Sequence, residues 1–236
     1  RLTDVTGVQT CALPIYVDDS FALSCALALP QVELCGISTV YGPVETRARI
    51  ARQLVGAYGK EIPIGRGESA PLSDKPVWRT GNEEANLLAE SGDSIFYDAV
   101  ELMREKILEK PGETVLVSIA PMTNIAKLVS KYPGVLEKAK RLVFMGGGIF
   151  EKKETEKATD VGLLQLIEEY DIRSFDPRYA TFYEHNLGAD PESAMRVMQT
   201  SIPKLMVGRN ITQEAIFPTQ ELMDKFTSCP DRKSVV

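Results

Sequence analysis

Apolar residues along this chain fall into two kinds of run, and the two kinds alternate. Continuous apolar runs bounded by turn residues predict strands that are buried on both faces of a sheet. Such runs lie at 32–40, 114–120 and 141–148, and further strands are predicted at 61–67 and 202–210. Runs whose apolar residues recur at helical spacing predict amphipathic helices. These lie at 20–29, 44–59, 93–110, 123–132, 191–200 and 219–226.

Strands that alternate with helices of this length predict βαβ units. We therefore expect an α/β fold: a doubly wound, mostly parallel sheet with helices on both faces. Ligands of such sheets bind beyond the carboxyl ends of the strands. Functional residues should follow the strands directly, around Asp18, Gly42, Ala120, Gly146 and Glu184.

Three predictions concern how individual helices begin and which face they bury. Thr123 is expected to be the N-cap of the helix at 123–132. The helix at 44–59 should bury a stripe of Val44, Ala48, Ala51, Leu54 and Val55. The helix at 93–110 should bury a stripe of Phe96, Val100, Met103 and Ile107.

The two ends of the chain do not follow this pattern. RLTDVTGVQTCALPI at the start has no period of 2 or 3.6 and no capping residues, and it resembles translated sequencing-adapter sequence, as does the final SCPDRKSVV. Such segments are excluded from fold reasoning. We expect residues 1–16 to be a non-native segment, 17–226 a single incomplete domain truncated at both ends, and 227–236 a non-native tail.

Composition narrows the classes of protein that this chain can belong to. A net charge of −6 disfavours nucleic acid as a partner, because phosphate binders present a basic face. No apolar run reaches the roughly 18 residues that span a bilayer, and no signal peptide is recognisable, so a cytoplasmic protein without a membrane partner is expected. The four cysteines have no zinc-binding spacing.

The pair Asp18-Asp19 is the first candidate for chemistry. Val17 is expected to end a strand, and the two aspartates then lie in the turn before a helix. Two carboxylates at such a turn can bind a hard cation such as Ca²⁺. Aspartates at a helix start also accept backbone N–H bonds and complement the helix dipole. On the pair alone, capping is the favoured interpretation.

The stretch EHNLGADPESA at 184–194 is a further candidate. If it is extended, Glu184 and Asn186 point the same way, and a carboxylate with an amide suits the vicinal hydroxyls of a sugar. A polar loop is an equal alternative. His185, the only histidine, is expected to be structural or exposed rather than catalytic.

Five motifs, in this order, resemble those of the inosine/uridine-preferring nucleoside hydrolase family. VDDSFALSCAL keeps the second half of the family's D-x-D-P-G-x-D-D-A-x-A-L, and GISTVYGPVE is similar to its strand leading into a G-N-V turn. APMTNIA is similar to G-P-L-T-N-I-A, FMGGGI to M-G-G-G, and EHNLGADPESA to E-x-N-x-x-x-D-P-E-A-A. The resemblance covers Val17 to Phe226.

The resemblance implies a Rossmann-like nucleoside hydrolase fold and Ca²⁺-dependent hydrolysis of the N-glycosidic bond of ribonucleosides to ribose and free base. It also implies that the intact protein is a homo-oligomer. It places Asp19 and the backbone carbonyl of Ile119 at the Ca²⁺ ion. The residues that it assigns to substrate contacts are Asp18, Met145, Glu184 and Asn186.

Departures from the family pattern fall on the residues that carry the chemistry. The family's general-base aspartate falls on Pro14 and its acidic partner on Ala12, so no catalytic residue is retained. The turn asparagine of many members is Pro43, and the family's C-terminal His-Asp pair has no counterpart before residue 236. We expect the parent protein to be a nucleoside hydrolase and this polypeptide to be inactive or nearly so.

Three alternatives stay open at the level of sequence. Glu169 and Asp171 form a second candidate for the ribose-binding pair. The fold could instead hold a sugar or nucleoside without cleaving it. A metal-dependent phosphatase using Asp18-Asp19 is the other alternative, although the D-x-D of that chemistry is absent. The sequence does not distinguish purine from pyrimidine preference.

Overall fold

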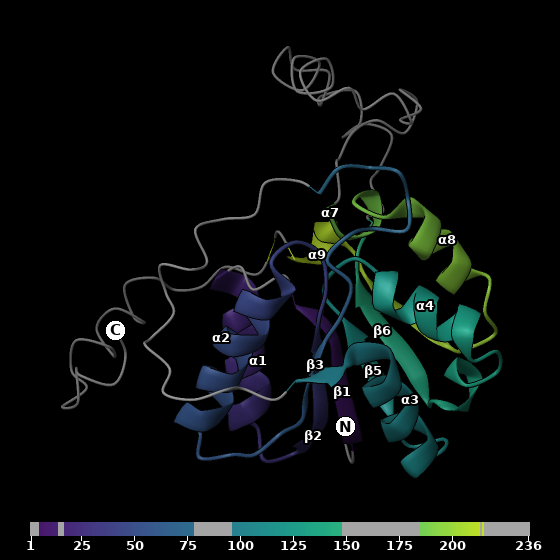
Figure 1. Cartoon of the computed structure of the whole chain (residues 1–236). Helices are drawn as coiled ribbons and strands as arrows, with labels where there is room; N and C mark the ends of the chain where they lie inside the picture. Colours follow the sequence, from purple (N-terminus) through teal and green to yellow (C-terminus); the bar gives the residue numbers. More distant parts are fainter. Residues whose placement is uncertain (1–4, 14–16, 78–95, 148–184, 213, 215–236) are drawn as a thin grey trace.

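A computed structural model describes residues 5–13, 17–77, 96–147, 185–212 and 214 of the chain. Within this part, seven strands form one sheet in the order β4-β3-β2-β1-β5-β6-β7, and each neighbouring pair is parallel (Figure 1). The strands are β1 Val5–Leu13, β2 Val32–Thr39, β3 Ile64–Arg66, β4 Tyr97–Asp98, β5 Val115–Ser118, β6 Arg141–Met145 and β7 Lys204–Val207.

Helices cover both faces of this sheet. α1 and α2 lie on one face, and α3, α4 and α8 lie on the other (Figure 1). The helices are α1 Val17–Ala28, α2 Val44–Ala57, α3 Ala99–Glu109, α4 Thr123–Lys131, the 3₁₀ turn η2 Leu136–Lys138, α7 His185–Gly188, α8 Pro191–Met198 and α9 Arg209–Thr212. The predicted doubly wound α/β fold is confirmed.

Each face has its own apolar core. Leu23, Ile37, Ala48 and Val55 belong to the cluster between the sheet and α1–α2. A larger cluster on the other face is centred on α3 and α4, with Met103 and Ile125 both 0% exposed. None of the described helices is long and apolar enough to cross a membrane.

The central strand β1 was not predicted. Its backbone pairs with β2 on one side and β5 on the other, so that Thr10 lies opposite both Ile37 and Val117. Sequence reasoning assigned no element to this stretch because its apolar residues keep no period of 2 over their whole length. The strand is defined instead by its two neighbours in the sheet. The non-native origin proposed for residues 1–16 stays a prediction.

Two details of the predicted helices were wrong. α3 begins after Asp98, whose carboxylate accepts hydrogen bonds from the N–H groups of Val100 and Glu101, both at 2.9 Å. Phe96 therefore lies outside the helix and packs against the core under α1 and α2. Thr123 is the first helical residue of α4, not its N-cap.

Candidate active site

The chain reverses its direction of winding between β1 and β5. From β1 the sheet extends through β2, β3 and β4, and the chain then returns to β5 on the other side of β1. A ligand of an open α/β sheet binds in the crevice outside the carboxyl ends of its strands at such a reversal. The candidate site therefore lies beyond the ends of β1 and β5.

Four predicted site residues lie at this edge of the sheet. Asp18 and Asp19 are in the first turn of α1, which follows β1. Ile119 comes directly after β5, and Met145 is the last residue of β6. The topology thus places residues distant in sequence at neighbouring strand ends.

The two aspartates have different environments. Asp19 is 6% exposed, whereas Asp18 is exposed to solvent. Val17 is the first residue of α1, so the expectation of a strand end at Val17 was wrong. Both carboxylates lie in the first turn of this helix, where the helix dipole favours negative charge. Dipole stabilisation and ligand binding are compatible roles for this pair.

Asn186 contacts the end of β6. Its Nδ2 donates to the backbone carbonyl of Met145 and to the Met145 sulfur, both at 3.1 Å. The structure therefore brings together two of the residues expected to bind substrate. His185–Gly188 is helical, so the expectation of an extended segment was wrong for these residues. Glu184 and the alternative Glu169–Asp171 lie outside the described residues.

Asn124 ties three segments together at the same edge. Its Nδ2 donates to the carbonyl of Thr39 at 2.9 Å, and its Oδ1 accepts from the N–H of Glu68 at 3.0 Å. Asn124 is 0% exposed. A β-carbon on the adjacent Gly67 would overlap both the Asn124 amide and the Thr39 carbonyl, so this position requires glycine.

Asp190 is a buried carboxylate that joins three further segments. It accepts hydrogen bonds from the N–H groups of Leu72 at 2.9 Å and Ser73 at 3.1 Å, and from the Thr123 hydroxyl at 2.6 Å. Ser193 donates to it from both its N–H and its hydroxyl. Burial alone would raise the pKa of Asp190, but these hydrogen bonds outweigh burial and lower that pKa below 3.8.

His185 packs beside the turn that follows β2. Its ring lies edge-to-face against Tyr41, with ring centroids 5.7 Å apart and an interplanar angle of 89°. Burial, and secondarily the positive charge of Arg47, lower the pKa of His185 below 6.5. The expectation that His185 is structural agrees with this packing.

The residues that the structure describes do not make a complete Ca²⁺ site. Ca²⁺ takes six to eight oxygen ligands, commonly from several carboxylates. No cluster of three or more His, Cys, Asp or Glu side chains suited to a metal occurs in the described part of the chain. Ala12 and Pro14 carry no side-chain oxygen, which leaves the buried Asp19 and backbone carbonyls such as that of Ile119.

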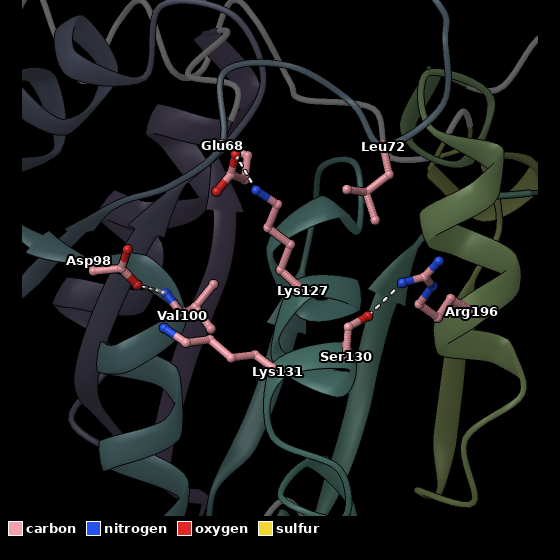
Figure 2. Close-up of a pocket in the computed structure, with 8 residues that line it drawn as sticks. All are labelled: Glu68, Leu72, Asp98, Val100, Lys127, Ser130, Lys131 and Arg196. Carbon is pink, nitrogen blue, oxygen red and sulfur yellow. Dashed lines mark hydrogen bonds and ion pairs between the residues drawn. The ribbon is translucent and has the colours of Figure 1, made fainter.

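A cavity of about 430 Å³ lies elsewhere, on the face covered by α3, α4 and α8 (Figure 2). None of the predicted site residues lines it. Its lining residues are Glu68, Leu72, Asp98, Val100, Lys127, Ser130, Lys131 and Arg196.

Ion pairs compensate the three cations of this cavity. The pairs are Lys127–Glu68 at 2.7 Å, Lys131–Glu101 at 2.7 Å and Arg196–Glu192 at 3.1 Å. A phosphate-binding site needs a surplus of positive charge. The cavity therefore gives no support to the phosphatase alternative.

Sequence reasoning missed two buried polar residues near the site. Arg47 is 0% exposed and lies on the buried stripe of α2, where only apolar residues were expected, while Leu54 is half-buried. Arg47 lies three residues after Val44, and this spacing was a usable signal of its burial, because side chains three positions apart share a helix face. The Asp-Pro-Glu start of α8 marks Asp190 as a cap, but nothing local indicates its contacts with Leu72 and Thr123.

Comparison with known proteins gives a consistent match. The sequence profile of the family described as "Inosine-uridine preferring nucleoside hydrolase" matches residues 14–234. The non-specific ribonucleoside hydrolase RihC of Escherichia fergusonii is 31% identical over 224 residues, a match that covers 86% of this chain and 64% of that protein. RihC of Escherichia coli is 30% identical, with the same coverage. The chain spans less than two thirds (64%) of the length of these curated relatives.

Solved structures share the fold. A plant nucleoside hydrolase superposes with a TM-score of 0.72 at 22% identity, over 92% of this chain and 64% of that one. A purine-preferring ribonucleoside hydrolase from Gardnerella vaginalis gives a TM-score of 0.69 at 22% identity, over 93% of this chain and 67% of that one. At these identities the likeness concerns the arrangement of the elements.

Proposed function

Since this chain belongs to the inosine-uridine preferring nucleoside hydrolase family, we propose that its function is hydrolysis of the N-glycosidic bond of ribonucleosides, giving ribose and a free base. The observation that carries the proposal is the position of the retained motif residues. Asp18, Asp19 and Ile119 follow the carboxyl ends of β1 and β5, and Met145 is the last residue of the neighbouring β6.

The chemistry of these residues suits a ribose. Asp18 is exposed at the start of α1, where its carboxylate can accept hydrogen bonds from sugar hydroxyls. Asn186 is held against Met145 at the end of β6. Cleavage of the glycosidic bond builds positive charge on the sugar, and carboxylates lining the crevice stabilise that charge. Asp18 and Asp19 supply two negative charges there.

The same proposal includes a dependence of this hydrolysis on Ca²⁺ in the intact protein. Of the groups expected at the ion, this chain supplies Asp19 and the carbonyl of Ile119. With Ala12 and Pro14 in place of carboxylates, the chain lacks both a general base and two anionic ligands. Losing a general base alone slows such reactions by about 10²–10⁴-fold. The 236-residue chain should therefore turn over slowly or not at all.

The decisive experiment compares the chain with a variant in which the acidic motif is restored. The chain and the Ala12→Asp/Pro14→Asp double variant are incubated with inosine and uridine, with Ca²⁺ or with a chelator, and base release is followed by chromatography. We expect base release to be at least about 10²-fold faster in the double variant with Ca²⁺.

Each outcome has a distinct meaning. Rapid base release by the unaltered chain would show that Pro14 does not replace the general base. Absence of both turnover and nucleoside binding in both proteins would overturn the proposed function. Binding of inosine by both proteins, with turnover in neither, favours the second candidate, a nucleoside-binding protein on a hydrolase fold, for which Pro14 is the supporting observation.

We also propose that the intact protein is a homo-oligomer located in the cytoplasm. Sedimentation of the purified protein tests the oligomeric state, since a single species at the mass of one chain would contradict it.

A further inference from the structure

The turn between β2 and α2 holds a bulky residue in an unfavourable backbone conformation. Tyr41 has a φ of 66° and is 1% exposed, and Gly42 follows it with a φ of 74°. Glycine adopts this left-handed conformation easily, whereas a β-carbon makes it costly. Strained residues of this kind persist where the surroundings hold them, and they cluster at functional sites.

Arg47 is the side chain that holds this turn. It lies in the first half of α2, is 0% exposed, and directs Nη1 back toward the end of β2. Nη1 donates to the carbonyl of Val40 at 2.8 Å and also to the carbonyl of Tyr41. A hydrogen bond from a charged donor is about twice as strong as a neutral one. The buried guanidinium therefore fixes two successive carbonyls of the turn.

Backbone contacts hold the other side of the same turn. The N–H of Tyr41 donates to the carbonyl of Glu68 at 2.6 Å, and the N–H of Gly42 donates to the carbonyl of Ser69 at 2.8 Å. The carbonyl groups of the turn are therefore bonded to Arg47, and its N–H groups are bonded to the segment that follows β3. The position of the Tyr41 ring follows from this fixed backbone.

The Tyr41 ring meets α7. His185, the first residue of α7, packs edge-to-face on Tyr41, and Ala189, just after α7, lies in the same buried cluster as Tyr41. The next residue after His185 is Asn186, which bonds to Met145. The first turn of α7 is therefore held by the β2–α2 turn through His185 and by β6 through Asn186.

We propose that Arg47 and Tyr41 are positioning residues for α7: Arg47 fixes the strained turn, the Tyr41 ring fixes His185, and His185 sets the position of Asn186 in the ribose pocket. The role of Asn186 in this statement rests on the function proposed above. Neither Arg47 nor Tyr41 touches the substrate in this scheme.

The single histidine makes a direct test possible. Because the chain contains one histidine, the imidazole signals in an NMR spectrum belong to His185 alone, and the ring current of Tyr41 shifts them. In Arg47→Met the His185 signals should move toward their values in unfolded peptides. Arg47→Lys, which keeps a cationic donor, should restore part of the native shift. Arg49→Met removes an exposed arginine from the same helix and should leave the signals unchanged.

Inosine binding gives the second readout. The dissociation constant, measured by saturation-transfer NMR on the full chain, should rise about 10-fold in Arg47→Met, because small displacements of positioning groups have large effects on ligand contacts. Arg49→Met should bind as the unaltered chain does. A loss of affinity in Arg47→Met with partial recovery in Arg47→Lys supports the proposal.

The two proposals fail in different ways. Unchanged His185 signals in Arg47→Met overturn the positioning role, whatever happens to inosine binding. If the unaltered chain does not bind inosine, the function proposed above fails for this chain, while the His185 signals still decide whether Arg47 positions α7.

A second variant covers the case in which Arg47→Met does not fold. Tyr41→Gly removes the ring but suits the left-handed turn. It should keep a cooperative unfolding transition and shift the His185 signals. Native His185 signals in Tyr41→Gly overturn the proposal.

Discussion

The side-chain amide of Asn186 donates to both the backbone carbonyl and the sulfur of Met145, at 3.1 Å in each case. This contact joins α7 to the end of β6, two segments that lie 41 positions apart in the sequence. It fixes the orientation of the Asn186 amide by engaging its nitrogen. Two residues expected from motif resemblance to bind the same sugar are thereby neighbours in space.

Asp190 should be essential for stability. Asp190→Asn should lower the free energy of unfolding by about 3 kcal/mol, because hydrogen bonds to a charged group are strong and an amide NH₂ would face donors such as the Ser193 N–H. Urea denaturation at pH 7 measures the change. Glu192→Gln, two residues away and exposed, is the matched control and should change stability by less than about 0.5 kcal/mol.

The same carboxylate should give the chain an acid-sensitive component of stability. The pKa of Asp190 is lower in the folded chain than its ordinary value of 3.8, so the unfolded state binds more protons between these two values. Its contribution is present above pH 3.8 and is lost as the pH falls through the folded-state pKa. Acid unfolding followed by circular dichroism should show this component in the unaltered chain and not in Asp190→Asn.

Two glycine substitutions should have opposite effects. Gly67→Ala places a methyl group against Asn124 and the Thr39 carbonyl, and we expect a loss of about 1–3 kcal/mol from overpacking. Gly56→Ala, in the last turn of α2, meets nothing within 4 Å and should gain about 0.5–1 kcal/mol. Thermal unfolding of both variants checks the signs. Equal midpoints would show that the space beside Gly67 is not restricted.

His185 should make the folded state less stable in mild acid. Its pKa is lower in the folded chain than the ordinary 6.5, so the unfolded state binds more protons and stability rises with pH in this window. The loss begins near pH 6.5 and continues as the pH falls through the folded-state pKa. Urea denaturation at pH 7 and at pH 5.5 measures it.

The control for this prediction is His185→Gln. Since the chain contains no other histidine, this variant should lose the difference in stability between the two pH values. An NMR titration of His185 with a midpoint at or above pH 6.5 would contradict the prediction.

Restoring the acidic motif should restore Ca²⁺ binding. The unaltered chain should show little change of its thermal midpoint with millimolar Ca²⁺. Ala12→Asp/Pro14→Asp should be stabilised by about 2.7 kcal/mol when Ca²⁺ is present at 100 times its dissociation constant. Adding Asp19→Asn to the double variant should remove this gain, and a gain that persists would show that Asp19 is not a ligand.

The fold was predictable because parallel strands buried on both faces are continuous apolar runs. The runs at 32–40 and 114–120 correspond to β2 and β5 within two residues at each end. The positions just after the strands followed from the topology alone. The edge of the sheet that carries the candidate site could therefore be predicted from the sequence. The strand β1 could not, because its pairing with β2 and β5 defines that strand.

The buried polar contacts around the site were less accessible to prediction. An arginine on an amphipathic helix is usually exposed, whereas Arg47 is buried and donates to the carbonyls of Val40 and Tyr41. The Asp-Pro-Glu sequence is a local signal for the helix cap at Asp190, but the hydrogen bonds of Asp190 to Leu72 and Thr123 cross more than sixty positions of sequence. Such contacts depend on how elements pack, which local pattern does not encode.

The central place of β1 has a consequence for biosynthesis. Val8 pairs with Val115, so once residues 5–13 have left the ribosome they wait for a partner that is made about a hundred residues later. Until then one edge of this strand is open to pairing with other nascent chains. Chaperone demand during translation should therefore depend on how quickly residues 115–118 emerge.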